Sequence, residues 1–239
     1  MTGGLSVIIP AYNESQKIAS TLDEVARYLD GKKIDYEILV LNDGSTDTTV
    51  ADASAAAARH PRIRVRDRRE NFGKGRTVKE GIAMAAHAHC LFMDADNSTT
   101  IAEWEKFEPL FGAGARAVVA SRHLPDSRIL HPQPLARRVL GAGYRAICRM
   151  LFGVRASDFN CGFKAYETAL AKRIYAQTEM SDWTFDVEVF CLLKKEGVAV
   201  AEVPVSWTHE DKASSLAPFR TAWNSLKSLA KLKRRFGRP

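Results

Sequence analysis

The chain has 239 residues, of which 46% are hydrophobic and 26% charged. This length suits one α/β domain with a sizeable core and is short for two, and the composition is that of an ordinary globular protein. No apolar run approaches the 18 residues of a membrane span, and the first residues lack the pattern of a signal peptide, so we expect neither feature. The four cysteines include no C-x-x-C pair, which favours reduced thiols.

Positive charge is concentrated in the last residues. The chain has 35 basic and 28 acidic residues, a formal net charge of +7. Seven basic residues and no acidic one follow Phe219, so the rest of the chain is formally neutral. A basic segment of this kind suggests an anionic lipid or a nucleic acid as partner.

Short apolar runs alternate with helical patterns in the first half. In chain order, the expected elements are a strand at 6–10, a helix at 18–29, a strand at 36–41, a helix at 48–59, a strand at 63–65, a helix at 75–86, a strand at 90–93, a helix at 103–111 and a strand at 117–120. This alternation predicts an α/β fold, with a mostly parallel sheet and helices on both faces. The part after residue 121 is less regular, and we expect it to shape the acceptor side.

Polar motifs follow three of these strands, at residues 11–14 (AYNE), 42–45 (NDGS) and 94–96 (DAD). Ligands of open α/β sheets bind beyond the carboxyl ends of the strands, so these motifs are expected to converge on one site. Asp94 and Asp96 directly follow an apolar strand. Because Mg²⁺ prefers oxygen ligands and is often held by one or two carboxylates and substrate phosphates, this pair predicts a metal site against a diphosphate.

Two further motifs allow more than one interpretation. Residues 42–47 (NDGSTD) form either a turn with a helix cap, or a place where Asp43 accepts hydrogen bonds from a nucleobase or ribose. Residues 71–76 (NFGKGR) open a helix with two glycines and Lys74, which suits an anion as well as a plain glycine-rich turn. The segment matches neither a dinucleotide fingerprint nor a P-loop.

The segments 157–164 and 181–188 suggest no mechanism by spacing alone. We expect Trp183 and Phe185 in the core, and Asp186 and Glu188 on different faces of a helix, because they lie two residues apart.

Taken together, these segments resemble the family 2 glycosyltransferases of the GT-A fold. The motifs at 10–14, 42–47, 71–75 and 94–96 stand in the family's order. Within the family the chain is most similar to the dolichyl-phosphate β-glucosyltransferases and other polyprenyl-phosphate hexose synthases. The segments that carry this closer resemblance are 120–122 (ASR), 161–164 (CGFK), 183–188 (WTFDVE) and 202–207 (EVPVSW).

The resemblance implies a role for several residues by position. The nucleotide-binding residues are Pro10, Tyr12, Glu14, Asp43, Lys74 and Asp94. Asp94 and Asp96 hold Mg²⁺ or Mn²⁺ on the diphosphate, and Arg122 and Lys212 bind the acceptor phosphate. The implied catalytic residues are Asp94, Asp96, Arg122 and Asp186.

Two positions depart from the family's pattern. The second-strand motif usually begins with paired aspartates, and here the first residue is Asn42. The family often has a Ser-Lys pair soon after the segment that corresponds to 202–204, and here Lys212 stands at a different position.

A phosphate acceptor fits this chemistry. A phosphate monoester is mostly a dianion at neutral pH and needs no catalytic base, so a single displacement inverts the anomeric centre. The expected reaction moves a hexose, with UDP-glucose favoured as donor, to a polyprenyl phosphate. The alternatives are a GDP-mannose-dependent mannosyltransferase and a non-catalytic nucleotide-sugar-binding protein of the membrane surface. Nucleic acid is not expected as a partner, because the body of the chain is neutral and shows no reader motif.

The last segment has the pattern of an interfacial helix. We expect a glycosyltransferase domain over residues 1–218 and a basic amphipathic helix over 219–239 that contacts an anionic membrane surface. The enzyme would then be cytoplasmic and peripheral on the cytoplasmic face of a membrane. The alternative is a helix that packs its apolar stripe on the body of the protein.

Overall fold

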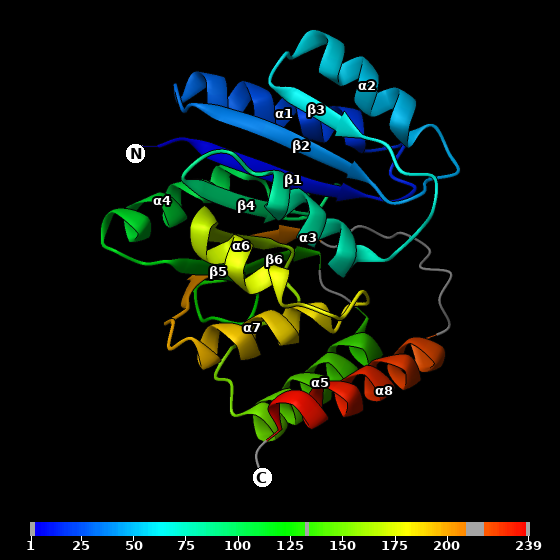
Figure 1. Cartoon of the computed structure of the whole chain (residues 1–239), viewed down its shortest axis with the longest axis vertical. Coiled ribbons are helices and arrows are strands. Elements are labelled where there is room, and N and C mark those ends of the chain that lie inside the picture. Colours follow the sequence, from blue (N-terminus) through cyan, green and yellow to red (C-terminus); the bar gives the residue numbers. More distant parts are fainter. Residues whose placement is uncertain (1–2, 132–133, 209–217, 238–239) are drawn as a thin grey trace.

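The computed structural model describes residues 3–131, 134–208 and 218–237, without the side chains of 218–226. In this part of the chain a seven-stranded sheet has the order β3-β2-β1-β4-β7-β5-β8 (Figure 1). Its strands are β1 (Leu5–Ala11), β2 (Tyr36–Asn42), β3 (Ile63–Arg66), β4 (His89–Met93), β5 (Ala117–Ser121), β7 (Phe163–Glu167) and β8 (Ala201–Pro204). β7 runs antiparallel to its neighbours β4 and β5, and the other strand pairs are parallel.

Helices cover both faces of this sheet. One face carries α1 (Ile18–Gly31), α2 (Thr49–Arg59) and α4 (Trp104–Gly112), which follows the short 3₁₀ helix η1 (Ile101–Glu103). The other carries α3 (Lys74–Met84), α6 (Thr168–Ala176) and α7 (Phe185–Lys195). Each face has its own hydrophobic core, because residues of the buried strands point alternately to the two sides. The predicted α/β class, with its mostly parallel sheet, is confirmed.

The elements of the first half agree with the sequence patterns. Each predicted strand and helix up to residue 121 is present, with ends within two residues of those expected. Strands β1 and β2 read as continuous apolar runs because both of their faces are covered. The antiparallel insertion of β7 between β4 and β5 was not predicted.

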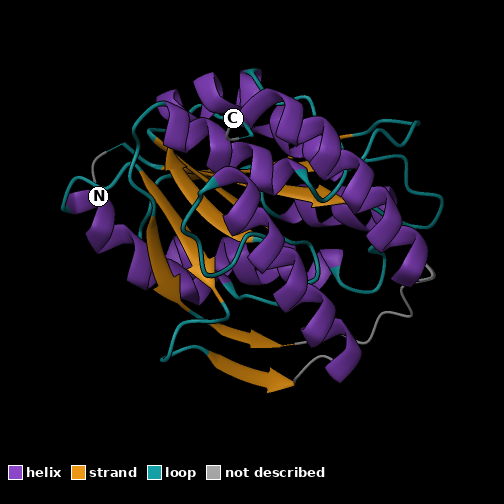
Figure 2. Ribbon diagram, turned by 90° about the horizontal axis from the view of Figure 1, so that it is seen from below, coloured by secondary structure: helices purple, strands orange, loops and turns teal. Residues whose placement is uncertain are grey.

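The remaining elements lie at one end of the sheet. β6 (Arg128–His131) and β9 (Ser206–Thr208) form a separate parallel pair, seen at the lower edge of Figure 2. The long helix α5 (Leu135–Phe152) follows β6, and α8 (Pro218–Phe236) lies beside α5 (Figure 1). Among the described residues, no helix combines the length and the apolar character that crossing a membrane requires.

The contact of α3 with the sheet gives a test of the packing. A β-carbon at Gly81 would lie 2.4 Å from Ile8 Cγ2 and 3.0 Å from Leu41 Cδ2. We expect Gly81→Ala to lower the free energy of unfolding by about 1 to 2 kcal/mol, because overpacking costs about 1 to 3 kcal/mol and alanine returns at most about 1 kcal/mol of helix propensity. Denaturant unfolding measures this loss.

Gly112→Ala, at the end of α4, is the matched control. No atom lies within 4 Å of a β-carbon at Gly112, so this change should leave stability equal or slightly raised. Equal stability of the two variants would contradict the close contact between α3 and β1.

Candidate active site

The polar motifs that follow β1 and β2 lie together at one edge of the sheet. Ala11 at the end of β1 pairs in register with Asn42 at the end of β2. Beyond these ends, Asn13 N donates to Ser45 Oγ at 2.9 Å, and Asn13 Oδ1 accepts from Thr46 N at 2.9 Å. The two loops are therefore held by each other, as predicted from their places after parallel strands.

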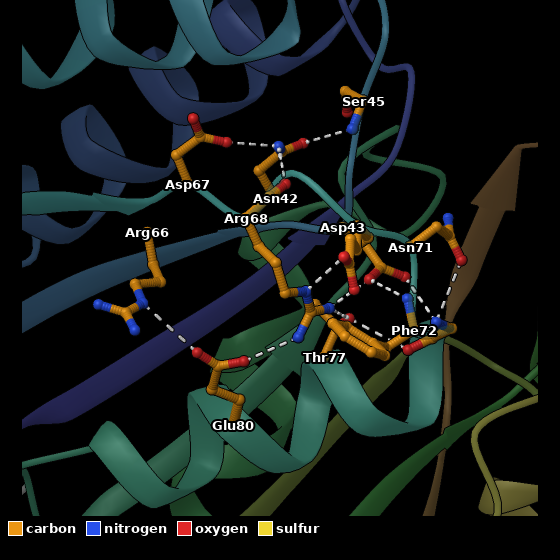
Figure 3. Close-up of polar contacts among 12 residues, drawn as sticks. Asn42, Asp43, Ser45, Arg66, Asp67, Arg68, Asn71, Phe72, Thr77 and Glu80 are labelled. Atoms are coloured by element: carbon orange, nitrogen blue, oxygen red, sulfur yellow. Dashed lines mark hydrogen bonds and ion pairs between the residues drawn. The ribbon is translucent and has the colours of Figure 1, made fainter.

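Asn42 has a structural role that explains the departure from paired aspartates. Its amide Nδ2 donates to Asp67 Oδ1 at 2.7 Å and to Arg68 O at 3.1 Å, and its Oδ1 accepts from Ser45 N at 3.1 Å (Figure 3). A carboxylate at this position could not donate, and it would face the Asp67 carboxylate.

Asp43 joins the second motif to the start of α3. Its carboxylate accepts from Phe72 N and Gly73 N, each at 2.9 Å, and forms an ion pair with Arg68 (Figure 3). These contacts use three of about four acceptor positions of a carboxylate whose side chain is 5% exposed. At the start of α2 it is Asp47 whose Oδ1 accepts from Thr49 N, at 3.0 Å, so the two interpretations of the motif concern different side chains.

Lys74 brings the start of α3 to the end of β4. Its Nζ donates to Asp94 Oδ1 at 2.7 Å and lies 4.5 Å from the ring centre of Trp183. Burial disfavours the ammonium ion, but the negative charges of Asp94 and Asp186 outweigh it and raise the pKa of Lys74. Lys74 therefore stays charged and neutralises part of an acidic cluster.

The two carboxylates after β4 have different supports. Asp94 N donates to Gly162 O at 3.0 Å, and a β-carbon at Gly162 would lie 1.9 Å from Asp94 Oδ2, so a larger residue there would displace the Asp94 carboxylate. Asp96 Oδ1 accepts from Ser98 N at 3.0 Å. Both side chains are partly exposed beyond the strand end, where they can meet a ligand.

A buried ion pair stands behind this cluster. Lys164 in β7 and Asp186 in the first turn of α7 form it, and their side chains are 1% and 3% exposed. Burial raises the pKa of Asp186, while the charges of Lys164 and Lys74 oppose the rise. Positive and negative groups therefore alternate along the line Lys164, Asp186, Lys74 and Asp94.

Arg122 follows β5 and is held by an acidic partner. Its Nε and Nη2 donate to the two carboxylate oxygens of Asp158 at 2.7 and 3.0 Å. Burial opposes the ionised form of Asp158, but Arg122 holds the pKa of that carboxyl well below its usual range. Gly162, four residues beyond Asp158, accepts from Asp94 N, so the segment 158–162 joins the Arg122 and Asp94 ends of the site.

Arginines also act on His123, which follows Arg122. Burial lowers the pKa of His123, Asp158 opposes this effect, and the charges of Arg145, Arg122 and Arg149 add to it. Arginine charge near this end of the site therefore exceeds the charge of Asp158, which favours an additional anion.

Three of the predicted nucleotide-binding residues lie at the end of β1 or just beyond it. Tyr12 follows β1 and is 49% exposed, Glu14 N donates to Thr49 Oγ1 at 2.7 Å, and Pro10 lies in β1.

Phe185 is buried, as predicted, but Trp183 is 49% exposed, so its expected place in the core was wrong. Trp183 lies in the turn before α7, where it covers Lys74. Lys212 lies outside the described residues.

Sequence reasoning missed Lys164, Asp158 and Gly162. A lysine within the apolar run of 159–166 signals a buried charge that needs a partner, but the sequence did not identify Asp186 as that partner. Asp186 and Glu188 do point to different partners, since Glu188 accepts from Glu179 N and Met180 N.

The donor groups at the end of β4 suit a hard divalent cation. Asp94 and Asp96 offer only oxygen ligands, and Lys74 already holds positive charge against Asp94. No group of three or more His, Cys, Asp or Glu side chains in the described residues could hold a metal. An ion held by Asp94 and Asp96 would therefore need further oxygen ligands from substrate phosphates and water.

The buried pair gives a prediction for stability. We expect Lys164→Met to lower the free energy of unfolding by about 3 kcal/mol, because it leaves Asp186 buried with only the more distant Lys74 to compensate it. The double variant Lys164→Met and Asp186→Leu should recover most of this loss in denaturant unfolding. An additive loss in the double variant would contradict a coupled pair.

Comparison with solved structures shows a shared fold. Mannosyl-3-phosphoglycerate synthase from Rubrobacter xylanophilus superimposes with a TM-score of 0.72 at 16% identity, over 98% of this chain and 75% of that one. Glucosyl-3-phosphoglycerate synthase from Mycobacterium tuberculosis, in complex with Mn²⁺ and UDP-glucose, gives a TM-score of 0.68 at 19% identity, over 100% of this chain and 80% of that one. These likenesses support the predicted GT-A fold.

Curated relatives are similar over most of the chain. The dolichyl-phosphate β-glucosyltransferase of Dictyostelium discoideum is 33% identical, over 97% of this chain and 74% of the relative. The enzymes of the same name from Drosophila melanogaster and Homo sapiens are 34% and 30% identical, over 90% and 91% of this chain and 70% and 71% of the relatives. Residues 6–179 match glycosyl transferase family 2. The resemblance drawn from the motifs is thereby confirmed, and the chain belongs to glycosyl transferase family 2.

Proposed function

We propose that this glycosyltransferase moves a hexose, with glucose favoured, from a nucleotide diphosphate sugar to a polyprenyl phosphate, with inversion at the anomeric carbon. The observation that carries the proposal is that one segment, residues 158–162, holds both sides of the site: Asp158 binds Arg122, and Gly162 O accepts from Asp94 N, while Lys74 donates to the Asp94 carboxylate. Similarity to the dolichyl-phosphate β-glucosyltransferases over nearly the whole chain supports the acceptor class.

The acceptor supplies its own nucleophile in this reaction. A phosphate monoester has a second pKa of about 6, so a dianionic oxygen attacks the anomeric carbon as the bond to the nucleotide diphosphate breaks. The protein's task is then to orient two anions and to stabilise charge on the departing diphosphate. Because no proton has to be removed, Asp186 is not needed as a base, and its contact with Lys164 suits a positioning role.

The residues divide between the two substrates. On the donor side, Tyr12, Glu14 and Asp43 bind base and ribose, and Lys74 lies by the diphosphate. On the acceptor side, Arg122 binds the phosphate, and Asp158 fixes its guanidinium group in place. The family resemblance also assigns Lys212 to this side.

A divalent cation completes the donor side. Asp94 and Asp96 would hold Mg²⁺ or Mn²⁺, and the bound ion would neutralise charge on the leaving diphosphate. The likeness in fold to a glucosyltransferase that binds Mn²⁺ with UDP-glucose supports this assignment.

A donor screen tests the proposal directly. Purified protein is incubated with Mg²⁺ or Mn²⁺, a polyprenyl phosphate and one of several nucleotide sugars, and the lipid product is identified by mass. A hexosyl polyprenyl phosphate is expected. Donor binding without a product would support the non-catalytic alternative instead.

Asp96→Asn should abolish transfer without unfolding the protein. The amide is isosteric but carries no charge for the cation, so we expect kcat/KM to fall at least about 100-fold, which corresponds to about 2.7 kcal/mol. Steady-state kinetics with varied Mn²⁺ measure the effect.

Asp35→Asn is the control for Asp96→Asn. Asp35 precedes β2 at the opposite edge of the sheet, and its side chain is 74% exposed, so this variant should keep full activity. Full activity of Asp96→Asn, or activity of the parent protein that a chelator leaves unchanged, would contradict the metal role.

The choice of nucleobase is a separate prediction. We expect UDP to bind at least about tenfold more tightly than GDP in the presence of metal, a difference of about 1.4 kcal/mol. Isothermal titration calorimetry with both nucleotides gives the ratio, and Asp43→Asn should weaken UDP binding if the remaining acceptor position of Asp43 meets the base. Tighter binding of GDP would favour the mannosyltransferase alternative.

The acceptor implies a place at a membrane. A polyprenyl phosphate does not leave its bilayer, so a peripheral position on the cytoplasmic face is proposed, with the basic residues of 219–239 as one contact. In residues 227–236 of α8, whose side chains the structure describes, Leu229 and Leu232 are buried against the body, while Lys231, Lys233 and Arg234 are exposed. The apolar stripe of this part is thus used for packing, and only its basic face is available to lipid.

A further inference from the structure

Helix α5 carries an apolar stripe on the side that faces away from the protein. The stripe residues are all exposed and recur at spacings of three or four: Leu135, Val139, Ala142, Ala146 and Met150. Leu135, Val139 and Met150 are 71%, 63% and 71% exposed. A surface helix normally turns such a stripe toward the core, so this one marks a surface that a partner covers.

The opposite side of α5 packs against the body of the protein. Cys148 and Phe152 are buried in the core on the face of the sheet that also carries α7, and Tyr144, Ile147 and Leu151 pack against that core. α8 lies beside α5 and contributes Leu229 and Leu232 to the same core. The outward stripe is therefore a second apolar face, separate from the one that folds the helix onto the body.

The charge of this region is of one sign. Between Asp126 and Asp158 the sequence has six arginines and no acidic residue. Arg137, Arg138 and Arg149 of α5 are exposed. Apolar side chains interleaved with arginine are typical of helices that lie in the interface of an anionic membrane, where each basic residue near the surface adds roughly 1 kcal/mol.

The strand before α5 extends this surface. In β6, Ile129 and Leu130 are 39% and 62% exposed. β6 ends only four residues before α5 begins, and Figure 2 shows both at the same end of the molecule. The end of β6 and the start of α5 thus lie near each other, and since successive strand residues point to opposite faces, one of the two apolar residues of β6 can extend the stripe.

The same helix also reaches the acceptor side of the site. Arg145 and Arg149 lie on the flank of the stripe. Arg149 Nε donates to Ala156 O at 2.7 Å, two residues before Asp158, and the charges of Asp158 and Arg122 act on Arg145. Lipid held against the stripe would consequently have its phosphate group near the cations around Asp158. A protein partner would satisfy the apolar stripe equally well, but it would not account for an arginine-rich flank that continues into the acceptor site.

We propose that the stripe of α5, with the exposed end of β6, is the surface by which this protein docks on an anionic bilayer, with α5 parallel to the membrane plane. This rests on the proposed function for the direction in which the acceptor enters. In this proposal α5 supplies the apolar contact with the bilayer. The part of α8 whose side chains are described, residues 227–236, offers only positive charge to it.

Vesicle co-sedimentation tests the proposal without any substrate. The full chain is mixed with vesicles of phosphatidylcholine and phosphatidylglycerol, or of phosphatidylcholine alone, at fixed salt. The triple variant Leu135→Ser, Val139→Ser and Met150→Ser should lose about tenfold or more in partitioning to the mixed vesicles, because it removes the apolar contact. Arg138→Gln, on the flank of the stripe, should weaken binding to mixed vesicles about fivefold and leave binding to neutral vesicles unchanged.

A matched pair of methionines controls for the loss of exposed apolar surface. Met84→Ser, on α3, exchanges a 37% exposed methionine and should leave vesicle binding unchanged, whereas Met150→Ser should weaken it. Thermal unfolding of the α5 variants should match the parent, because Leu135, Val139 and Met150 are 63 to 71% exposed, whereas Met84→Ser should lower the unfolding temperature slightly because Met84 is mostly buried. Parent-like vesicle binding of the triple variant would overturn the proposal. A second result would also overturn it: the parent protein is a dimer, the triple variant is a monomer, and both bind vesicles equally. The stripe would then be a subunit interface.

Transfer assays separate this proposal from the proposed function. With a long-chain polyprenyl phosphate in vesicles, the triple variant should be slow, whereas it should keep parent activity on a short, water-soluble prenyl phosphate. If the parent protein transfers hexose to neither acceptor, the proposed function fails while the vesicle result still stands. Equal slowing with both acceptors would place the defect in the site and overturn docking by α5.

Discussion

The need to neutralise one buried lysine organises the active site. Lys164 has no exposed surface in the centre of the sheet, and an unpaired charge there would cost several kcal/mol. Asp186 supplies the partner, which fixes the first turn of α7 against β7. Asp186 in turn acts on Lys74, and Lys74 bonds Asp94. Four elements, β7, α7, α3 and the end of β4, are therefore held together by alternating charges.

This arrangement also prepares the site for its charged substrates. Asp94 and Asp96 would repel a diphosphate if they stood alone, and Lys74 offsets only part of their charge. The remaining negative charge would suit a divalent cation, which would attract the diphosphate. On the acceptor side the balance is opposite, because Arg122 pairs with the single carboxylate of Asp158 and the charges of Arg145 and Arg149 act nearby. One side thus favours a cation with the donor, and the other favours an anion.

The sequence predicted the parallel half of the fold and much of the donor side. Strand and helix periods are local, and motifs after parallel strands must meet at one edge, so periodicity alone was enough to group Asn42, Asp43 and Asp94. The antiparallel β7 could not be predicted, because strand order depends on contacts between distant segments. For the same reason the partners of Lys164 and Arg122 were missed, and Trp183 was expected in the core although it covers Lys74 at the surface.

The last helix, α8, contacts α7 and is also the proposed contact with the membrane. Glu188 lies in α7, two residues beyond Asp186, and is fully buried. It accepts from Glu179 N and Met180 N, and Arg235 of α8 donates to its Oε1 at 2.5 Å. Two backbone donors alone would leave a buried carboxylate without a counter-charge, so α8 stabilises the part of α7 that positions Asp186. A loss of activity on removing 219–239 would therefore not by itself identify the tail as a membrane anchor, whereas the exposed stripe of α5 can be changed without touching this pair.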